Sequence, residues 1–140
     1  MSKVMKAGCI LMDIKNKKIG LVYREYLHDY SFPKGHLEEG ETLVECAVRE
    51  TAEETKRDVL VLLDEPICLE EYVTPRGEDV LMHYYLAKDI GHSDNDSTDT
   101  HELLWVDYDK VYDMLTYPSL KKVWNNVKDK VKEYFDNGGK

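Results

Sequence analysis

The strongest constraint on the fold is a stretch without proline or glycine, from Thr42 to about Arg57, between two regions rich in strand-forming residues. Thr42 stands three residues before Glu45, which is the spacing of a capping box and predicts that a helix begins there. The apolar and small residues that recur on one side of this stretch are Leu43, Val44, Ala47, Val48, Thr51 and Thr55. This periodicity gives the helix one face to bury, so we expect it to pack against a sheet.

Strands are predicted on both sides of this helix, because the flanking segments are rich in Ile, Val, Leu and Tyr. The predicted strands cover residues 4–14, 19–26, 59–72 and 78–88, with a further short strand within residues 101–108. A polar run separates the first two strands, and Pro75 and Gly77 supply the turn between the next two. The sequence therefore predicts two long hairpins.

A second helix is predicted near the C-terminus, over about residues 118–135. Its apolar stripe has helical spacing and consists of Leu120, Val123, Trp124, Val127 and Val131. We expect this stripe to pack on the sheet rather than on a partner protein. Residues 91–100 are polar and lack periodicity, which predicts a mobile surface loop. Strands mixed with two or three helices indicate an α+β or three-layer architecture, and the length suits one domain over residues 1–140.

Composition narrows the class of partner and the compartment. The net charge of -9 argues against stable binding to nucleic acid, although it allows a phosphorylated small molecule whose charge is screened by divalent cations. Cys9, Cys46 and Cys68 are odd in number and lie in or beside apolar runs, which predicts reduced thiols in a cytoplasmic protein. The apolar N-terminal run is too short to span a membrane. The oligomeric state stays open.

The charged residues of the first helix form two rows, because residues three or four apart are neighbours on a helix. The first row alternates in sign and consists of Glu45, Arg49, Glu53 and Arg57. The second row is entirely negative and consists of Glu50, Glu54 and Asp58. Repulsion along the second row, near the negative end of the helix dipole, costs up to about 1 kcal/mol. Carboxylate clusters suit Mg²⁺ or Mn²⁺, so we predict a metal site there; the alternative is a solvated helix face.

A turn with unusual backbone requirements precedes the helix. Pro33 fixes its own φ, Gly35 allows conformations closed to other residues, and Lys34 between them offers a cation. Because Lys34 lies close in sequence to the acidic helix, the turn and the helix are predicted to form one cradle for a phosphate group.

This segment resembles the signature of the Nudix hydrolases. The matching positions, all at the family spacing, are Gly35, Glu41, Arg49, Glu50, Glu53 and Glu54. Three positions depart from the pattern: Thr51 and Arg57 replace aliphatic residues, and Lys56 replaces the closing glycine. A glycine there lets the helix end in a left-handed turn, so Lys56 must either adopt that conformation, at about 1 kcal/mol, or let the helix continue.

The resemblance implies a fold and a reaction. The expected fold is the Nudix α/β/α sandwich with a mixed central sheet and long hairpins. The expected reaction is the metal-dependent hydrolysis of a phosphoanhydride bond in a nucleoside diphosphate linked to another group, with Mg²⁺ or Mn²⁺ as the cofactor. The alternative from a different class is a Nudix-like module that binds a nucleotide without turnover.

The resemblance also implies roles for individual residues. Glu54 and Glu50 are expected to be the principal metal ligands, and Glu53 a further ligand or the base that activates water. The Gly35 carbonyl is expected to add a ligand, and Arg49 to orient the carboxylates.

Many family members take a base or ligand from a late acidic residue. Glu102 occupies such a position as the predicted catalytic residue, with Asp99 as its rival.

The expected substrate follows from the turn before the helix. Its Phe-Pro-Lys-Gly-His sequence is most similar to the asymmetric diadenosine tetraphosphate hydrolases, in which the lysine, here Lys34, contacts phosphate. His36 is expected either to contact phosphate or to hydrogen-bond within the loop. His83 and Tyr85, on one face of a predicted strand, are candidates for stacking on the base. The alternative substrates are RNA 5′ ends and nucleoside triphosphates, because similar turns occur in those enzymes.

Overall fold

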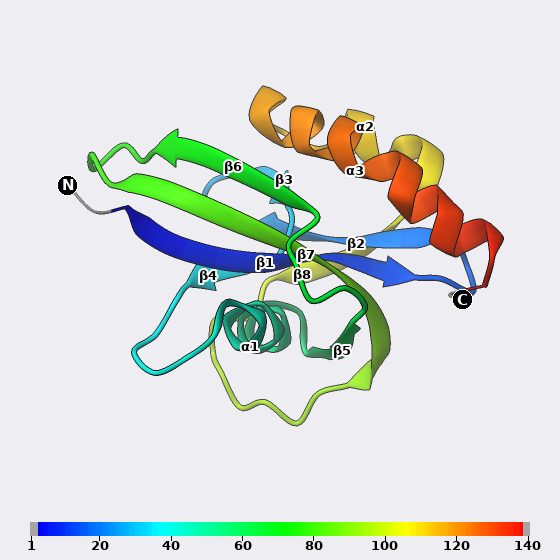
Figure 1. Ribbon diagram of the computed structural model, residues 1–140, viewed down its shortest axis with the longest axis horizontal. Helices are drawn as coiled ribbons and strands as arrows, with labels where there is room; N and C mark the ends of the chain where they lie inside the picture. Colours follow the sequence, from blue (N-terminus) through cyan, green and yellow to red (C-terminus); the bar gives the residue numbers. More distant parts are fainter. Residues whose placement is uncertain (1–2, 139–140) are drawn as a thin grey trace.

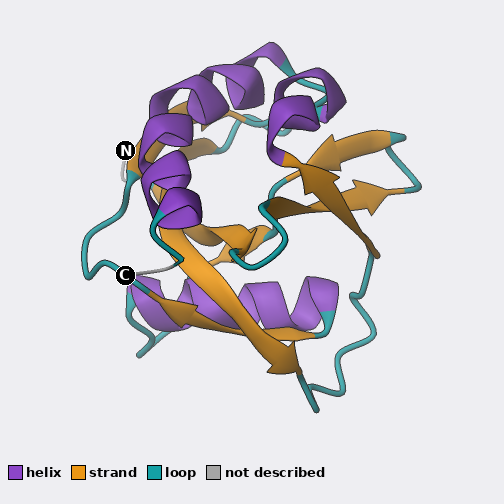
Figure 2. Cartoon of the chain, turned by 90° about the vertical axis from the view of Figure 1, so that its right-hand side faces the viewer, coloured by secondary structure: helices purple, strands orange, loops and turns teal. Residues whose placement is uncertain are grey.

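The computed structural model describes residues 3–138 and shows a sheet of eight strands between two helical layers (Figures 1 and 2). The strands are β1 (Val4–Asp13), β2 (Lys18–Arg24), β3 (Asp29–Ser31), β4 (Lys34–His36), β5 (Arg57–Val61), β6 (Cys68–Val73), β7 (Asp79–His92) and β8 (Glu102–Asp107). The helices are α1 (Leu43–Thr55), α2 (Val111–Met114) and α3 (Pro118–Asp136), with a 3-10 turn at Tyr108–Lys110. α1 covers one face of the sheet and α2 and α3 the other, which confirms the α+β class and the predicted sandwich (Figure 1).

The sheet is mixed, as predicted, because β1 and β7 run parallel at its centre, with Val4 opposite Val80. The remaining pairs are antiparallel. The order is β3-β2-β1-β7-β5, with β4 on β1, β6 on β7 and β8 on β2. The first predicted hairpin is confirmed, since Leu11 pairs with Gly20.

The predicted strand over residues 59–72 is wrong as a single element, because it is divided into β5 and β6. Both strands pair with β7, the first with Val61 opposite Ala87 and the second with Cys68 opposite Tyr84. Pro66 lies between them and has no N–H to donate to a ladder, so one continuous strand is disfavoured there. The second hairpin therefore has two short strands, β5 and β6, along one long strand.

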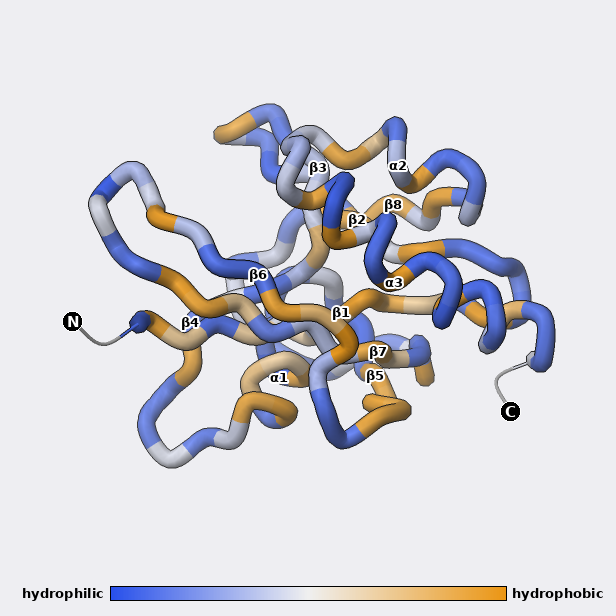
Figure 3. Tube along the Cα trace, turned by 45° about the horizontal axis from the view of Figure 1, so that its top comes forward, coloured by the Kyte–Doolittle hydropathy of each residue, from blue (hydrophilic) through white to orange (hydrophobic). Residues whose placement is uncertain are grey.

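Two clusters of buried residues form the core, one on each face of the sheet, and the apolar stretches lie along β1 and β7 (Figure 3). Alternation along β1 sends Ile10 and Met12 toward α3, while Cys9 and Leu11 face α1. The predicted stripe of α3 is buried on the sheet and consists of Leu120, Val123, Trp124, Val127 and Val131. Its assignment to the core is confirmed.

α1 begins where the sequence predicts. The Glu45 N–H donates to Thr42 Oγ1 over 3.1 Å, and the Thr42 N–H donates to the Glu45 carboxylate over 2.9 Å, which completes the capping box. The helix ends at Thr55, before the predicted Arg57, because Lys56 adopts the left-handed conformation with φ 60 and ψ 30. Lys56 therefore takes the strained turn that a glycine would take freely.

The early end of α1 changes both predicted charge rows. Arg57 belongs to β5, where its guanidinium pairs with the Asp89 carboxylate over 2.7 Å instead of with the helix. Asp58 also belongs to β5. The negative row on the helix is therefore reduced to Glu50 and Glu54.

The predicted surface loop over residues 91–100 is confirmed except at its start. Its first two residues belong to β7, and the rest is hydrogen-bonded to the end of α1. The Ser93 N–H donates to the Lys56 carbonyl over 2.9 Å, and the His101 N–H donates to the Glu54 carbonyl over 2.8 Å. The polar composition of the segment is typical of a loop without fixed contacts. Its backbone N–H groups instead donate to carbonyls at the end of α1 that have no partner within the helix.

Cys9, Cys46 and Cys68 are buried free thiols. Burial raises the pKa of Cys9 to about 12 and that of Cys46 to about 11, so both are protonated at neutral pH. None of the helices within residues 3–138 combines the length and the apolar character needed to cross a membrane.

A buried ion pair joins the first hairpin to the helical layer. Asp29 is fully buried, and its carboxylate accepts hydrogen bonds from Arg24 Nε and Nη2 over 2.8 and 2.6 Å. The Tyr117 hydroxyl donates to the same carboxylate over 2.6 Å. Burial acts to raise the pKa of Asp29, but the Arg24 and Tyr117 hydrogen bonds outweigh it, and the pKa lies below its ordinary value.

We predict that Asp29→Asn lowers the free energy of unfolding by about 3 kcal/mol, because it removes one partner of a buried ion pair. A lowered folded-state pKa stabilises the protein above the unfolded pKa of about 3.9, and that contribution is lost as the pH falls. The difference between wild type and variant should therefore be constant above about pH 5 and shrink below about pH 4. Urea unfolding at several pH values measures it.

The matched control is Asp107→Asn. Asp107 pairs with Lys18 over 3.2 Å at an exposed position, so its replacement should cost less than about 1 kcal/mol. Equal losses in the two variants would contradict the assignment of Asp29 as a structural anchor.

Candidate active site

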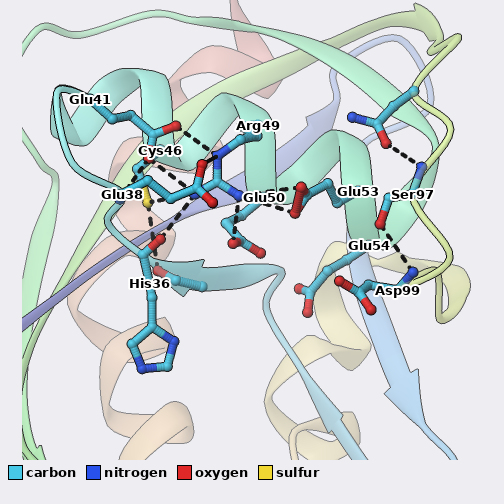
Figure 4. Close-up of polar contacts among 12 residues, drawn as sticks. His36, Glu38, Glu41, Cys46, Arg49, Glu50, Glu53, Glu54, Ser97 and Asp99 are labelled. Atoms are coloured by element: carbon cyan, nitrogen blue, oxygen red, sulfur yellow. Dashed lines mark hydrogen bonds and ion pairs between the residues drawn. The ribbon is translucent and has the colours of Figure 1, made fainter.

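Arg49 organises the acidic residues of the signature (Figure 4). Its Nε donates to Glu41 Oε2 over 2.6 Å, and its Nη1 lies 2.9 Å from Glu50 Oε2 and 3.0 Å from Glu53 Oε1. Its Nη2 donates to the His36 carbonyl over 3.0 Å. These contacts, led by the Glu41 hydrogen bond, raise the pKa of Arg49. With Glu38, which lies 3.4 Å from Nε, one permanent cation therefore pairs with four carboxylates and also binds the β4 backbone.

Glu54 has the most deeply buried carboxyl group of the acidic residues in α1. Its carboxylate accepts the backbone N–H of Lys34 over 2.9 Å, and it lies 3.6 Å from Nε2 of His101. Burial raises the pKa of Glu54 to about 7, although the Lys34 hydrogen bond opposes the shift. The carboxylate is therefore poorly solvated and available to a cation.

Gly35 allows Glu50 to lie against β4. A Cβ atom at Gly35 would collide with the Glu50 carboxyl group. Gly35 does not have a positive φ, so the sequence-based reason for this glycine is wrong: it is needed for close approach rather than for an unusual backbone conformation. Burial raises the pKa of Glu50, Arg49 opposes that shift, and the negative charges of Glu53 and Asp99 reinforce it.

The oxygen donors of this cluster are of the type that Mg²⁺ and Mn²⁺ prefer. The donors do not converge, because Arg49 holds Glu50 and Glu53 while the Lys34 N–H holds Glu54. Accordingly, no group of three or more His, Cys, Asp or Glu side chains among residues 3–138 is arranged to hold a metal ion. The residues fit the cofactor in chemistry, because they supply oxygen donors, and Glu50 and Glu54 lie one helical turn apart on α1.

The structure separates the two late acids. The Asp99 carboxylate lies close enough to Glu50 for its charge to raise the pKa of that residue. Glu102 begins β8 opposite Tyr23 and has an exposed side chain. No hydrogen bond or ion pair within residues 3–138 joins Glu102 to the carboxylates of α1. Both late acids have exposed side chains, so Glu102 stays the predicted catalytic residue, with Asp99 as the rival whose charge acts on Glu50.

A cavity of about 470 Å³ lies beside Lys34. Its lining includes three cations and two aromatic residues: Lys6, Arg24, Lys34, Tyr72 and Tyr117. Burial, followed by the nearby charge of Arg24, lowers the pKa of Lys34 to about 8. Burial also lowers the pKa of Lys6, and Arg24 adds to that shift. Arg24 is paired with Asp29, and Glu70 also lines the cavity, so Lys6 and Lys34 are the lining cations that a bound anion could neutralise.

The other predicted substrate contacts are not at this cavity. His36 is exposed, with Nε2 3.8 Å from Glu78 Oε2, and only its carbonyl joins the Arg49 network. His83 is buried and its Nδ1 lies 3.1 Å from the Lys6 carbonyl, while Tyr85 packs in the cluster under α1. Stacking of His83 and Tyr85 on a base is therefore contradicted by their burial, although the predicted shared strand face is correct.

Sequence reasoning missed Arg24, Lys6 and Tyr117 as cavity residues. Arg24 and Asp29 are five residues apart across a turn, and this pairing of opposite charges was the available clue. Tyr117 precedes the proline that begins α3, and only the packing of the helical layer brings it to the cavity.

Comparisons with known proteins agree with this geometry. The family model described as NUDIX domain matches residues 3–132. An 8-oxo-(d)GTP phosphatase of Mycolicibacterium smegmatis is 31% identical over 106 residues, which are 76% of this chain and 32% of that protein. The chain thus spans about a third of the length of this curated relative.

Two solved structures share the fold. A Caenorhabditis elegans Ap4A hydrolase in a binary complex has a TM-score of 0.75 at 22% identity, with 93% of this chain and 98% of that chain covered. A Nudix hydrolase from Nitrosomonas europaea has a TM-score of 0.75 at 18% identity, with 92% and 90% covered. At these identities the likeness concerns the fold alone. Because the family model spans nearly the whole described chain and the signature acids lie together around Arg49, the chain belongs to the Nudix family.

Proposed function

We propose that this chain is a metal-dependent pyrophosphohydrolase that cleaves a phosphoanhydride bond of a nucleoside polyphosphate, with residues 1–140 as its single catalytic domain. The observation that carries the proposal is the position of Glu54. The backbone N–H of Lys34 fixes the buried Glu54 carboxylate, and the side chain of Lys34 lines the cavity together with Lys6 and Arg24. Lys34 therefore joins the proposed cation site, which its backbone contacts, to the proposed polyphosphate site, which its side chain lines.

Residue roles follow from this arrangement. Glu50, Glu54 and the Gly35 carbonyl would hold the metal, and Glu53 would be a further ligand or the base. When bound, Mg²⁺ supplies charge neutralisation at the phosphate oxygens and lowers the pKa of the attacking water. Asp99 is a second candidate for the proton acceptor, because its negative charge is close enough to Glu50 to raise the pKa of that carboxyl group.

Arg49 keeps the acids within reach and remains protonated throughout, so it orients and does not transfer a proton. Lys34 and Arg24 would bind phosphate oxygens beyond the reacting phosphorus. His36 is expected to act through its carbonyl, which fixes the turn to Arg49.

The preferred substrate is a dinucleoside polyphosphate such as diadenosine tetraphosphate. Two cations that an anion could neutralise, Lys6 and Lys34, line one cavity and suit a chain of several phosphates better than a single one, while the whole chain carries excess negative charge. The Phe-Pro-Lys-Gly-His turn supports the same substrate. The second candidate is an oxidised nucleoside triphosphate, favoured by the name of the Mycolicibacterium relative.

The decisive experiment is a substrate panel with Mg²⁺ at mildly alkaline pH. The panel contains diadenosine tetraphosphate, 8-oxo-dGTP, RNA with a 5′ triphosphate and a nucleotide sugar, and initial rates are measured for each. We expect kcat/KM for diadenosine tetraphosphate to exceed the other values by at least about tenfold. Preference for 8-oxo-dGTP would support the second candidate. Nucleotide binding without cleavage of any compound would instead identify a non-catalytic module.

A further inference from the structure

Lys56 ends α1 in a backbone conformation that is unfavourable for lysine. It stands where the family signature has glycine, and it keeps the left-handed turn at φ 60 and ψ 30 despite its side chain. A lysine at such a position is strained, and glycine would remove the strain. Strain that persists in a structure is held in place by other contacts, so the contacts of the Lys56 side chain are informative.

The Lys56 ammonium group is bound to the segment before β8. Its Nζ donates to the Asn95 carbonyl and to the Ser97 carbonyl, each over 2.7 Å. The Lys56 carbonyl accepts the Ser93 N–H over 2.9 Å. One residue at the end of α1 therefore holds the segment through both its backbone and its side chain.

Two further hydrogen bonds attach the other end of this segment. The Thr100 hydroxyl donates to the Glu53 carbonyl over 3.1 Å, and the His101 N–H donates to the Glu54 carbonyl over 2.8 Å. These carbonyls lie in the last turn of α1, where helical partners are missing. Residues 93–101, which we name the α1-bound loop, therefore lie along the end of the helix that carries the signature acids.

The α1-bound loop also has internal hydrogen bonds that pass from the Lys56 contacts to Asp99. The Ser97 N–H donates to Asn95 Oδ1 over 2.8 Å, and the Asp99 N–H donates to Ser97 Oγ over 3.0 Å (Figure 4). Ser97 thus binds Lys56 through its carbonyl and Asp99 through its hydroxyl. The Asp99 side chain lies beside the Glu54 carboxylate in Figure 4.

We propose that Lys56 is a positioning residue that holds the α1-bound loop on the helix so that Asp99 faces the carboxylates of Glu50 and Glu54. A glycine at this position would leave the turn without a side-chain contact, whereas the Lys56 ammonium group fixes the end of the helix to the loop. The kinetic part of this inference rests on the proposed hydrolase function. The structural part, that Lys56 orders the loop, does not.

The central test is Lys56→Gly, which keeps the left-handed turn and removes the ammonium group. The melting temperature should change little, because the relief of strain at glycine opposes the loss of the two ammonium hydrogen bonds. Amide hydrogen exchange in residues 93–101, measured by mass spectrometry, should become faster, and kcat should fall on the order of tenfold with little change in KM. A purely structural role would lower stability instead.

Lys17→Gly is the matched control, since Lys17 has φ 56 in the turn between β1 and β2, away from the acidic cluster. It makes the same replacement in the same backbone conformation, and it should leave kcat and the exchange of the loop unchanged. Lys56→Arg should retain most of the wild-type turnover, because a guanidinium group also donates to two carbonyls. A loss in Lys56→Arg equal to that in Lys56→Gly would count against the contact.

A double-mutant cycle shows whether Lys56 acts through Asp99. Asp99→Asn should lower kcat, and the addition of Lys56→Gly should lower it no further if both changes affect one interaction. Independent losses that multiply would overturn the inference, as would unchanged loop exchange in Lys56→Gly.

Failure of the proposed function is distinguishable from these outcomes, because it would appear as a wild-type protein that cleaves no compound of the panel. In that case the exchange experiment alone would decide whether Lys56 orders the loop.

Discussion

The Glu54→Gln variant is expected to lose at least about 100-fold in kcat while it keeps its fold. Glutamine retains a carbonyl oxygen that accepts the Lys34 N–H, so the contact between α1 and β4 survives. It removes the charge that a divalent cation requires. It also relieves burial of an anion and repulsion from Glu50, so thermal unfolding should be unchanged or shifted upward.

Glu39→Gln is the matched control, because Glu39 is exposed and lies outside the signature acids, so this variant removes the same charge without affecting the site. Its kcat should equal that of the wild type. Titration with Mn²⁺, followed by calorimetry, gives a second measurement: affinity should fall in Glu54→Gln and not in Glu39→Gln. Full activity in Glu54→Gln would remove the basis for the metal assignment.

Arg49→Lys should lower kcat by about 10- to 100-fold and destabilise the fold by about 2 kcal/mol. Lysine keeps the positive charge, but it cannot contact Glu41, Glu50, Glu53 and the His36 carbonyl at once, as the guanidinium group does. The acids would then repel one another and lose their common orientation. Steady-state kinetics and chemical unfolding measure the two effects.

The control for Arg49 is Arg57→Lys, because Arg57 also forms a two-pronged pair, with Asp89, but away from the signature acids. This variant should lose a similar fraction of its ion-pair stabilisation and keep its kcat. If both variants lost turnover equally, activity would follow stability in general, and Arg49 would have no special role in orienting the acids.

Local sequence patterns predicted much of the fold. The capping box marked the start of α1, the apolar segment over residues 4–14 formed the strand β1, and the stripe of α3 was buried as expected. The spacing of Arg49, Glu50 and Glu53 places these three side chains in contact, whereas Glu54 binds the Lys34 N–H. Such features depend on neighbours within one or two helical turns, so they are visible in the sequence.

The features that sequence reasoning missed depend on contacts between distant segments. Pro66 marks the break between β5 and β6 in the sequence, but the pairing of both strands along the one long strand β7 depends on the length of β7. The pairing of Arg57 with Asp89 and of Lys56 with the α1-bound loop depends on where β7 ends. The burial of His83 and Tyr85 depends on α1 and β1 covering that face. No local pattern contains this information.

The parallel pairing of β1 with β7 has a consequence for the order of folding. Val4 to Met12 find their partners at Val80 to Lys88, so the centre of the sheet closes a long segment of chain. Closing such a segment costs entropy before the contact stabilises anything, which slows folding. During synthesis, the whole signature helix emerges before the strand that completes the sheet beneath it. The acidic residues of α1 therefore leave the ribosomal exit tunnel before the sheet that positions them can form.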